Sequence, residues 1–139
     1  MSSSVQQVPG IKRTDLQRHD LSVRGREVIQ HRVEISPEAP FVRHKHPGEE
    51  IIYVLEGSLE YQVDGDEPKT VNAGEVLFVP ADTVHAVRNA ASGNAAELAT
   101  YRAEQHDQRR GARDEAGGGS HADQPLPGDR AGHVVAVTV

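Results

Sequence analysis

The sequence contains no cysteine and no tryptophan, and its three tyrosines and two phenylalanines are the whole aromatic complement. The absence of cysteine excludes disulfides, thiolate nucleophiles and metal or iron–sulfur sites held by cysteine. Any bound metal must therefore be held by histidine and carboxylate side chains. Because only 4% of the residues are aromatic, the core has to be built mainly from Val, Ile, Leu and Ala, a composition that favours strands.

Long apolar runs and a concentration of basic residues are also missing. No apolar segment is long enough to cross a bilayer, and the N-terminus lacks the basic region and apolar run of a signal peptide. The formal net charge is −6, and Lys and Arg are scattered rather than gathered in a stripe. Nucleic acid and membranes are therefore not expected partners. We expect a soluble cytoplasmic protein.

The 139 residues suffice for one domain with a modest core. Residues 1–25 are predicted to be a flexible leader followed by a polar, irregular segment. Residues 26–101 are predicted to form the folded unit. Residues 102–139 are charged and rich in glycine, which predicts a disordered tail. Within that tail, the β-branched run at 133–139 could add a strand to a sheet edge.

Residues 26–101 carry short apolar segments with a period of two, separated by turn residues. The clearest segment runs from Arg26 to Ile35, and its core-facing positions are Ile29, His31, Val33 and Ile35. Further strands are predicted at 41–46, 51–55, 59–63, 69–71, 76–79, 83–88 and 95–101. The segment 51–55 is apolar on both faces, which predicts that both faces are covered. The pattern as a whole favours an all-β sandwich or barrel.

Residue types that bind metals are densest between Phe41 and Gly57, in the segment FVRHKHPGEEIIYVLEG. His44 and His46 are two residues apart, so a strand would project both imidazoles to one side, with Cβ atoms about 6–7 Å apart. The turn that follows, Pro47-Gly48, would let Glu50 face the same point. These residues supply three potential metal ligands within one short segment.

A fourth potential ligand is His85, in the segment GEVLFVPADTVHAVRN that runs from Gly74 to Asn89. Three neutral imidazoles and one carboxylate suit a divalent transition metal, namely Mn, Fe, Ni, Cu, Co or Zn. Magnesium and calcium match this set poorly because they prefer shells made only of oxygen. A metal that tolerates five or six ligands would keep positions open for a substrate. The predicted metal ligands are His44, His46, Glu50 and His85.

The two segments together resemble the paired motifs of the cupin superfamily. The first motif, G-x5-H-x-H-x(3,4)-E-x6-G, matches at His44, His46, Glu50 and Gly57. The second motif, G-x5-P-x-G-x2-H-x3-N, matches at Gly74, Pro80, His85 and Asn89. The chain departs from these patterns at Glu38 and Asp82, where the motifs have glycine. Aspartate tolerates left-handed backbone geometry, so the change at Asp82 is mild.

The resemblance implies a small single-domain cupin with a jelly-roll barrel, also called a double-stranded β-helix, a metal inside and a homodimeric assembly. It also implies an enzyme that acts on a small organic molecule, as a dioxygenase, an isomerase or a lyase. Glu50 would then be a ligand or a catalytic acid–base group. His31 is a second candidate for a catalytic role, with a structural role as the alternative.

A non-catalytic barrel that binds a small ligand, as a sensor does, is the alternative function. The two readings predict different cavities. An enzyme should offer an acid–base group near the metal beyond the ligands, whereas an empty apolar pocket would favour a binding module. The three tyrosines are predicted to be core residues that could also line the cavity: Tyr53, Tyr61 and Tyr101.

Overall fold

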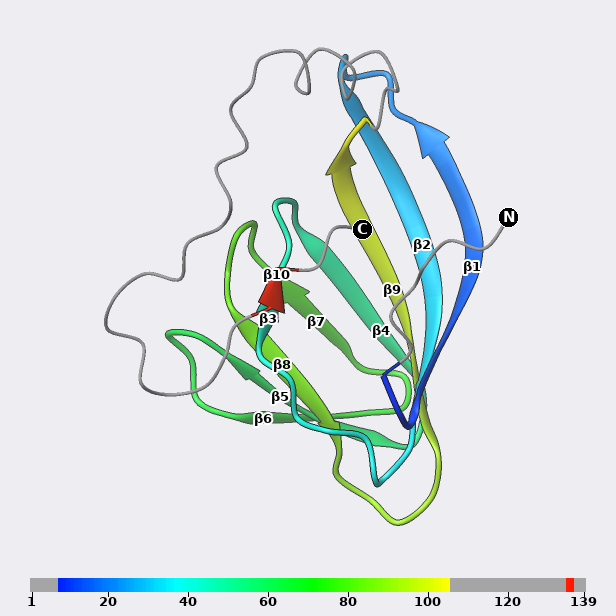
Figure 1. The fold of residues 1–139 in the computed structure, drawn as a ribbon, viewed down its shortest axis with the longest axis vertical. Helices are drawn as coiled ribbons and strands as arrows, with labels where there is room; N and C mark the ends of the chain where they lie inside the picture. The colour runs from blue at the N-terminus through cyan, green and yellow to red at the C-terminus, as the bar shows by residue number, and fades with distance from the viewer. Residues whose placement is uncertain (1–7, 106–134, 137–139) are drawn as a thin grey trace.

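The fold is described here from a computed structural model that covers residues 8–105 and 135–136 of the chain. The described residues form ten strands and no helix. The strands form two five-stranded sheets, in the orders β1-β2-β9-β4-β7 and β10-β3-β8-β5-β6 (Figure 1). Their bounds are β1 Ile11–Asp20, β2 Arg26–Ile35, β3 His44–Lys45, β4 Glu50–Glu56, β5 Ser58–Val63, β6 Lys69–Asn72, β7 Val76–Val79, β8 His85–Asn89, β9 Ala95–Glu104 and β10 Val135–Ala136.

The hydrophobic core lies between the two sheets, because strands of both sheets turn alternate residues inward. In β2 every second residue from Glu27 to Ile35 is buried, as the sequence period predicted. The core takes apolar side chains from both sheets, among them Ile52, Val54, Leu59, Tyr61 and Val71. Each fully buried aliphatic side chain contributes about 1.5–3 kcal/mol. The chain therefore folds as the jelly-roll barrel that was predicted.

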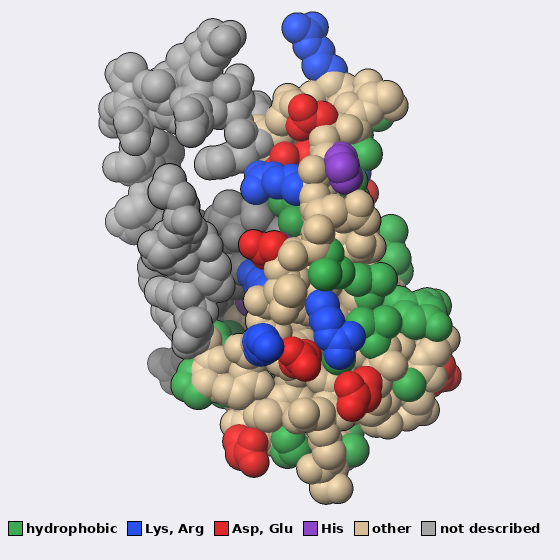
Figure 2. All heavy atoms as spheres, turned by 90° about the vertical axis from the view of Figure 1, so that its right-hand side faces the viewer, with side chains coloured by type: hydrophobic (Ala, Val, Ile, Leu, Met, Phe, Trp, Pro, Cys, Tyr) green, Lys and Arg blue, Asp and Glu red, His purple; other side chains and the backbone are tan. Residues whose placement is uncertain are grey.

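Residues 11–20, predicted to be irregular, instead form the edge strand β1, which pairs with β2 along its length. The sequence conceals this strand because most of its side chains are exposed, so it lacks an apolar period. Figure 2 looks onto the side of the molecule where β1 lies and shows charged side chains scattered among hydrophobic ones. Backbone pairing with β2, rather than burial of apolar side chains, therefore holds β1 in place. A bulge between Asp15 and Gln17 interrupts its register.

Strand β4 is covered on one face only, which corrects the prediction that both of its faces are covered. Its inward residues, such as Ile52, are fully buried. Its outward residues are exposed, and Tyr53 therefore does not line the barrel interior. The outward apolar side chains of β4 and of the neighbouring edge strand β7 are here called the β4–β7 face: Ile51, Tyr53, Leu55, Val76 and Phe78, each between 38% and 60% exposed.

The predicted terminal strand at 133–139 corresponds to β10, which pairs parallel to β3. The remainder of the predicted tail and the start of the predicted leader lie outside the described residues, at 1–7, 106–134 and 137–139. Strand β9 continues to Glu104, three residues past the predicted end of the barrel. Among the residues described, we find no helical segment with the length and hydrophobicity that crossing a bilayer requires.

Candidate metal centre

Strand pairing brings three histidines together. His44 on β3 lies directly opposite His85 on β8, and His46 follows two residues after His44. The ring centroids are 4.3 Å apart for His44 and His85, 5.0 Å for His44 and His46, and 5.2 Å for His46 and His85. One ring nitrogen of each histidine lies within 4.8 Å of the others. The structure therefore contains a three-histidine cluster with the spacing of a possible metal site.

Backbone carbonyls orient two of the three rings. Nδ1 of His44 lies 3.0 Å from the carbonyl oxygen of Val42, and Nδ1 of His85 lies 2.8 Å from that of Thr83. Because a carbonyl oxygen can only accept, both Nδ1 atoms donate, which leaves each Nε2 as a free lone pair in the neutral ring. Burial lowers the pKa of His44 and lowers that of His85 to about 4. Both rings are therefore neutral at pH 7, the form that binds metals.

Glu50, the first residue of β4, completes the cluster and is only 2% exposed. Its Oε2 lies 3.6 Å from Nε2 of His46, and its Oε1 lies 3.7 Å from Nε2 of His85. Both distances exceed the normal range of a hydrogen bond. Within the described part of the chain, neither Glu50 Oε2 nor His85 Nε2 has a hydrogen-bond partner.

Such unsatisfied buried atoms are costly, at about 1–3 kcal/mol each. A divalent cation held between Glu50 and the imidazoles would satisfy their lone pairs together. The donor set, one carboxylate and three imidazoles, is also the chemistry that divalent transition metals accept. The residues present therefore fit a metal ion.

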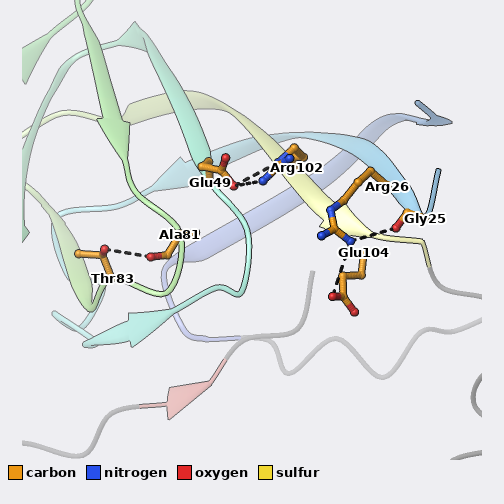
Figure 3. Close-up of polar contacts among 7 residues, drawn as sticks. All are labelled: Gly25, Arg26, Glu49, Ala81, Thr83, Arg102 and Glu104. Atoms are coloured by element: carbon orange, nitrogen blue, oxygen red, sulfur yellow. Dashed lines mark hydrogen bonds and ion pairs between the residues drawn. The ribbon is translucent and has the colours of Figure 1, made fainter. Parts of the chain in front are cut away.

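The loop between β3 and β4 packs against β9, and this contact fixes the position of Glu50 at the start of β4. A Cβ atom on Gly48 would lie 1.5 Å from the carbonyl oxygen of Arg102, so only glycine allows this approach. The backbone N–H of Arg102 donates to the carbonyl of Glu49 at 3.0 Å. The two side chains also form an ion pair, with Arg102 Nη2 2.9 Å from Glu49 Oε1 (Figure 3).

A second backbone contact joins the two motif segments. The N–H of Asp82, in the turn before β8, donates to the carbonyl of His46 at 2.8 Å. Asp82 has a φ of 58°, the left-handed geometry expected at this motif position, and it is the one non-glycine residue with positive φ among those described. The turn therefore positions His85 relative to His46.

The protonation of Glu50 depends on what surrounds it. Burial raises the pKa of Glu50 well above its usual range, and the charge of Glu97 raises it further. A hydrogen bond with Tyr101 and the positive charge of Arg13 act in the opposite direction. A cation beside Glu50 would favour the carboxylate strongly, since an opposite charge at this distance stabilises the ionised form.

A second buried carboxyl, Glu97, was missed by the sequence reasoning. It faces Val54 across the β4–β9 pair, whereas Glu50 faces Tyr101, so the backbone positions of the two acids are about 13 Å apart along the strands. The hydroxyl of Tyr61 donates to Glu97 Oε2, and burial raises the pKa of Glu97 to about 7. The signal for it was a charged residue within the inward-facing period of the predicted strand at 95–101.

His31 is buried on β2 but lies outside the three-histidine cluster. Its Nδ1 is 2.9 Å from Asp15 Oδ1 on β1, and burial lowers its pKa. The ring of Tyr101 contacts both His31 and His46, at centroid distances of 5.6 Å and 4.8 Å. A cavity of about 220 Å³ lies beside His31 at the β1 bulge. The ring of Tyr101 thus links His31 to His46 of the cluster.

The part of the chain that contains this cluster is similar to known proteins. Residues 31–101, half of the chain, match the family described as the cupin domain. The chain belongs to the cupin family. The matched residues contain both cupin motifs and all four clustered side chains, His44, His46, Glu50 and His85.

One curated relative of this cupin is dimethylsulfoniopropionate lyase DddQ from Ruegeria pomeroyi, which is 38% identical over 45 residues. That alignment covers 32% of this chain and 22% of the lyase, so the chain spans about a fifth of the relative it matches. The crystal structure of the same lyase superposes with a TM-score of 0.53 at 25% identity. The superposition covers 58% of this cupin and 40% of that chain.

Two further solved structures have the same fold. KdgF from Halomonas sp. is 20% identical with a TM-score of 0.56, covering 73% of this cupin and 84% of KdgF. Oxalate oxidase in complex with the substrate analogue glycolate is 24% identical, also with a TM-score of 0.56, covering 73% and 58%. At these identities the likeness shows the fold.

Proposed function

We propose that this cupin is a metal-dependent enzyme acting on a small organic molecule, with a divalent metal held by His44, His46, Glu50 and His85. The observation that carries the proposal is the convergence of four donor groups in which buried atoms of Glu50 and His85 have no hydrogen-bond partner among the described residues. Apolar side chains of similar volume would give a more stable barrel if no cation were bound here. Metal binding would compensate for the cost of burying these polar residues.

Catalysis is favoured over passive binding because acid–base groups lie next to the proposed ligands. Tyr101 is hydrogen-bonded to Glu50, and burial raises the pKa of Tyr101, so this hydroxyl keeps its proton at neutral pH. A protonated phenol beside a carboxylate places a proton donor and a proton acceptor at one point. A barrel that only binds a ligand has no need of this pair.

Lyase chemistry is the reaction class we favour, since the curated relative with a matching segment is a lyase. A bound metal would supply Lewis-acid polarisation of a substrate oxygen. Residues of the chain would carry out the proton transfers. Glu50, once displaced from the metal by the substrate, would accept a proton from a substrate carbon. The electrons of that C–H bond would form a double bond as the bond to the leaving group breaks. The Tyr101 hydroxyl would protonate the departing group and regain its proton from Glu50, to which it is hydrogen-bonded.

The test begins with elemental analysis of protein purified without chelators, followed by substrate screening with the metal found. Elimination consumes no dioxygen and creates an unsaturated product, which ultraviolet absorbance detects. Consumption of dioxygen during turnover would indicate a dioxygenase instead of a lyase. A substoichiometric metal content that does not change when His85 is substituted would contradict the proposed metal centre.

The proposal includes a homodimer that buries the β4–β7 face. This face gathers five exposed apolar side chains on two neighbouring strands, and its cross-strand pairs are Ile51 with Phe78 and Tyr53 with Val76. The fully buried part of a homodimer interface is more apolar than the rest of a protein surface, and a twofold axis pairs one patch with its own copy. The double-sided apolar pattern of β4 is explained if a second subunit covers its outer side.

A further inference from the structure

Strand β1 is the outermost strand of its sheet, and within the described part of the chain it pairs with β2 alone. In Figure 1 no other described strand lies beyond it on that side of the molecule. Its ten residues, Ile11–Asp20, therefore present a long edge of backbone N–H and C=O groups. Such an edge is a template for pairing with a further strand. The side chains of β1 decide whether this edge excludes a partner or selects one.

The side chains that β1 turns toward the barrel are mostly charged. They belong to the residues that stand opposite buried residues of β2, since directly opposed residues of an antiparallel pair project to the same face. The set is Ile11, Arg13, Asp15, Arg18 and Asp20. Its four charged members alternate in sign along the strand, from Arg13 to Asp20. Charges on an edge strand usually prevent pairing, but an alternating order can match a reversed copy of itself.

The bulge in β1 sets how this order meets a second copy. In a regular strand, the side chains of residues three apart point to opposite faces. Asp15 and Arg18 are three apart and yet both face the barrel, because the bulge inserts one residue between them. Two antiparallel copies of β1, related by a twofold axis between Leu16 and Gln17, would therefore set Asp15 of one copy opposite Arg18 of the other. The inner faces of both sheets then stay on the same side, so the sheet continues from one barrel into the next.

In this register every charged residue of the inner face meets the opposite charge. Asp15 meets Arg18 and Arg13 meets Asp20, and the twofold axis repeats both pairs. The neighbouring registers that also keep the two inner faces aligned bring Arg13 opposite Arg18, or Asp15 opposite Asp20. Opposite charges on facing strands stabilise the pair, and like charges destabilise it. The charges of β1 therefore favour self-pairing in one register.

The side chains in the middle of β1 remain accessible to a partner. Asp15 contacts His31, and its side chain is still 79% exposed. Arg18 pairs with Glu27, and its side chain is 49% exposed. Leu16, beside the axis, is 48% exposed. A second copy of β1 would shield Leu16 from water near the point where the two copies meet.

We infer that β1 pairs antiparallel with β1 of a second copy of this chain and joins two barrels through one continuous sheet. The partner is a second copy because the charge order of β1 complements itself. The inference is independent of the proposed metal enzyme, since no residue of the metal centre lies on β1. It also differs from the proposed contact through the β4–β7 face, because β1 and β7 lie at opposite ends of the sheet order.

The test reverses the charges of Arg13 and Asp20. Substitution of Asp15 or Arg18 would also disturb contacts within the barrel, so these two residues are left unchanged. Arg13→Asp and Asp20→Arg each set like charges opposite each other across the interface. The double variant Arg13→Asp/Asp20→Arg restores opposite charges in the reversed order.

The control is Lys12→Asp, which makes the same change of net charge as Arg13→Asp at the adjacent residue. In this register Lys12 lies opposite the uncharged Leu21. All variants are made in a Val76→Lys background, which disrupts the β4–β7 face. Sedimentation equilibrium from micromolar to low millimolar protein measures the dissociation constant of each variant.

Each single substitution should raise the dissociation constant roughly tenfold or more, because two like-charge pairs replace two opposite-charge pairs. The double variant should associate as tightly as the Val76→Lys parent, which a general loss of stability would not restore. Lys12→Asp should leave the dissociation constant unchanged. Asp20 is exposed, so Asp20→Arg decides the test even if Arg13→Asp fails to fold. A monomeric parent, unchanged single variants, or a double variant no tighter than the single variants overturns the inference.

Val76→Lys alone separates this interface from the one proposed at the β4–β7 face. A wild type that dimerises and becomes monomeric on Val76→Lys refutes the β1 interface and retains the β4–β7 interface. A wild type that dimerises equally well with and without Val76→Lys, and dissociates on Asp20→Arg, refutes the β4–β7 interface and retains the β1 interface.

Discussion

Two buried carboxyls in one barrel, Glu50 and Glu97, differ in what surrounds them. Glu97 accepts a hydrogen bond from Tyr61, so its burial is compensated by a neutral donor. Glu50 lies 3.6 Å and 3.7 Å from two imidazoles and keeps one oxygen without a hydrogen-bond partner among the described residues. Burial alone raises the pKa of both acids and does not distinguish them.

The difference shows which observation identifies a cation site. A raised pKa reports that a carboxyl is far from water, and both residues satisfy that condition. Unsatisfied lone pairs that converge with lone pairs of neutral imidazoles are a more specific sign, since a divalent cation satisfies all of them at once. Glu50 meets this second condition and Glu97 does not.

The largest expected effect is loss of metal when a histidine of the cluster is removed. His85→Ala takes away a ligand whose Nε2 has no other partner in the described chain, so metal affinity should fall on the order of a hundredfold or more. Elemental analysis after dialysis measures the metal content. His19→Ala, an exposed histidine of β1, is the control and should retain the wild-type content.

A matched pair of substitutions tests the comparison directly. Glu50→Gln should lower metal affinity roughly tenfold or more, because an amide oxygen carries no charge to offset the cation. Glu97→Gln makes the same chemical change at a carboxyl outside the three-histidine cluster, four residues further along the β4–β9 pair, and should leave the metal content unaltered. If both variants lose metal to the same extent, the distinction between the two carboxyls is wrong.

A smaller effect concerns pH and stability at Glu97. Its pKa is about 7 in the folded state against 4.5 for the free side chain, so the folded state binds the proton more tightly. The stability that Glu97 contributes is complete below about pH 4.5 and declines as the pH rises through 7. Glu97→Gln cannot ionise and should abolish that decline, which amounts to roughly 3 kcal/mol between pH 4.5 and pH 8.

Urea unfolding of wild type and Glu97→Gln at several pH values, with a chelator present, measures this difference. The chelator keeps metal binding from contributing to the pH dependence. Parallel pH profiles for the two proteins would mean that the pKa of Glu97 is the same in the folded and unfolded states, which would contradict the prediction.

The smallest expected effect concerns assembly and leaves the interior unchanged. Val76→Lys on the β4–β7 face should weaken the proposed dimer, while Val23→Lys should not, although both valines are 60% exposed. Sedimentation equilibrium over a range of concentrations measures the dissociation constant, which we expect to rise roughly tenfold for Val76→Lys. A monomeric wild type, or an equal shift in both variants, would contradict the proposed interface.

The sequence was sufficient to predict the barrel and the residues of the cluster because both have short-range signals. The period of two in β2 and the spacing of His44 and His46 can be read locally, and the cupin motifs supplied the distant His85. Strand β1 could not be predicted, because an exposed edge strand is held by backbone pairing that leaves no apolar pattern.

The exposure of the outward face of β4 could not be predicted from the sequence, for a different reason. An apolar residue covered by another part of the barrel and one that faces outward have the same signature in a sequence. Glu97 was missed because its surroundings depend on strand register, which aligns Glu97 with Val54. Register is a property of paired strands and cannot be read from one segment alone.

The hydrogen bond from Asp82 to the carbonyl of His46 has a consequence for the order of folding. It closes a loop of more than thirty residues, and such long-range contacts are slow to form. We therefore expect metal affinity to appear late in refolding, after the local hairpin of β5 and β6. Stopped-flow refolding with a metal-sensitive dye would record this delay, and simultaneous recovery of the hairpin and the metal affinity would contradict it.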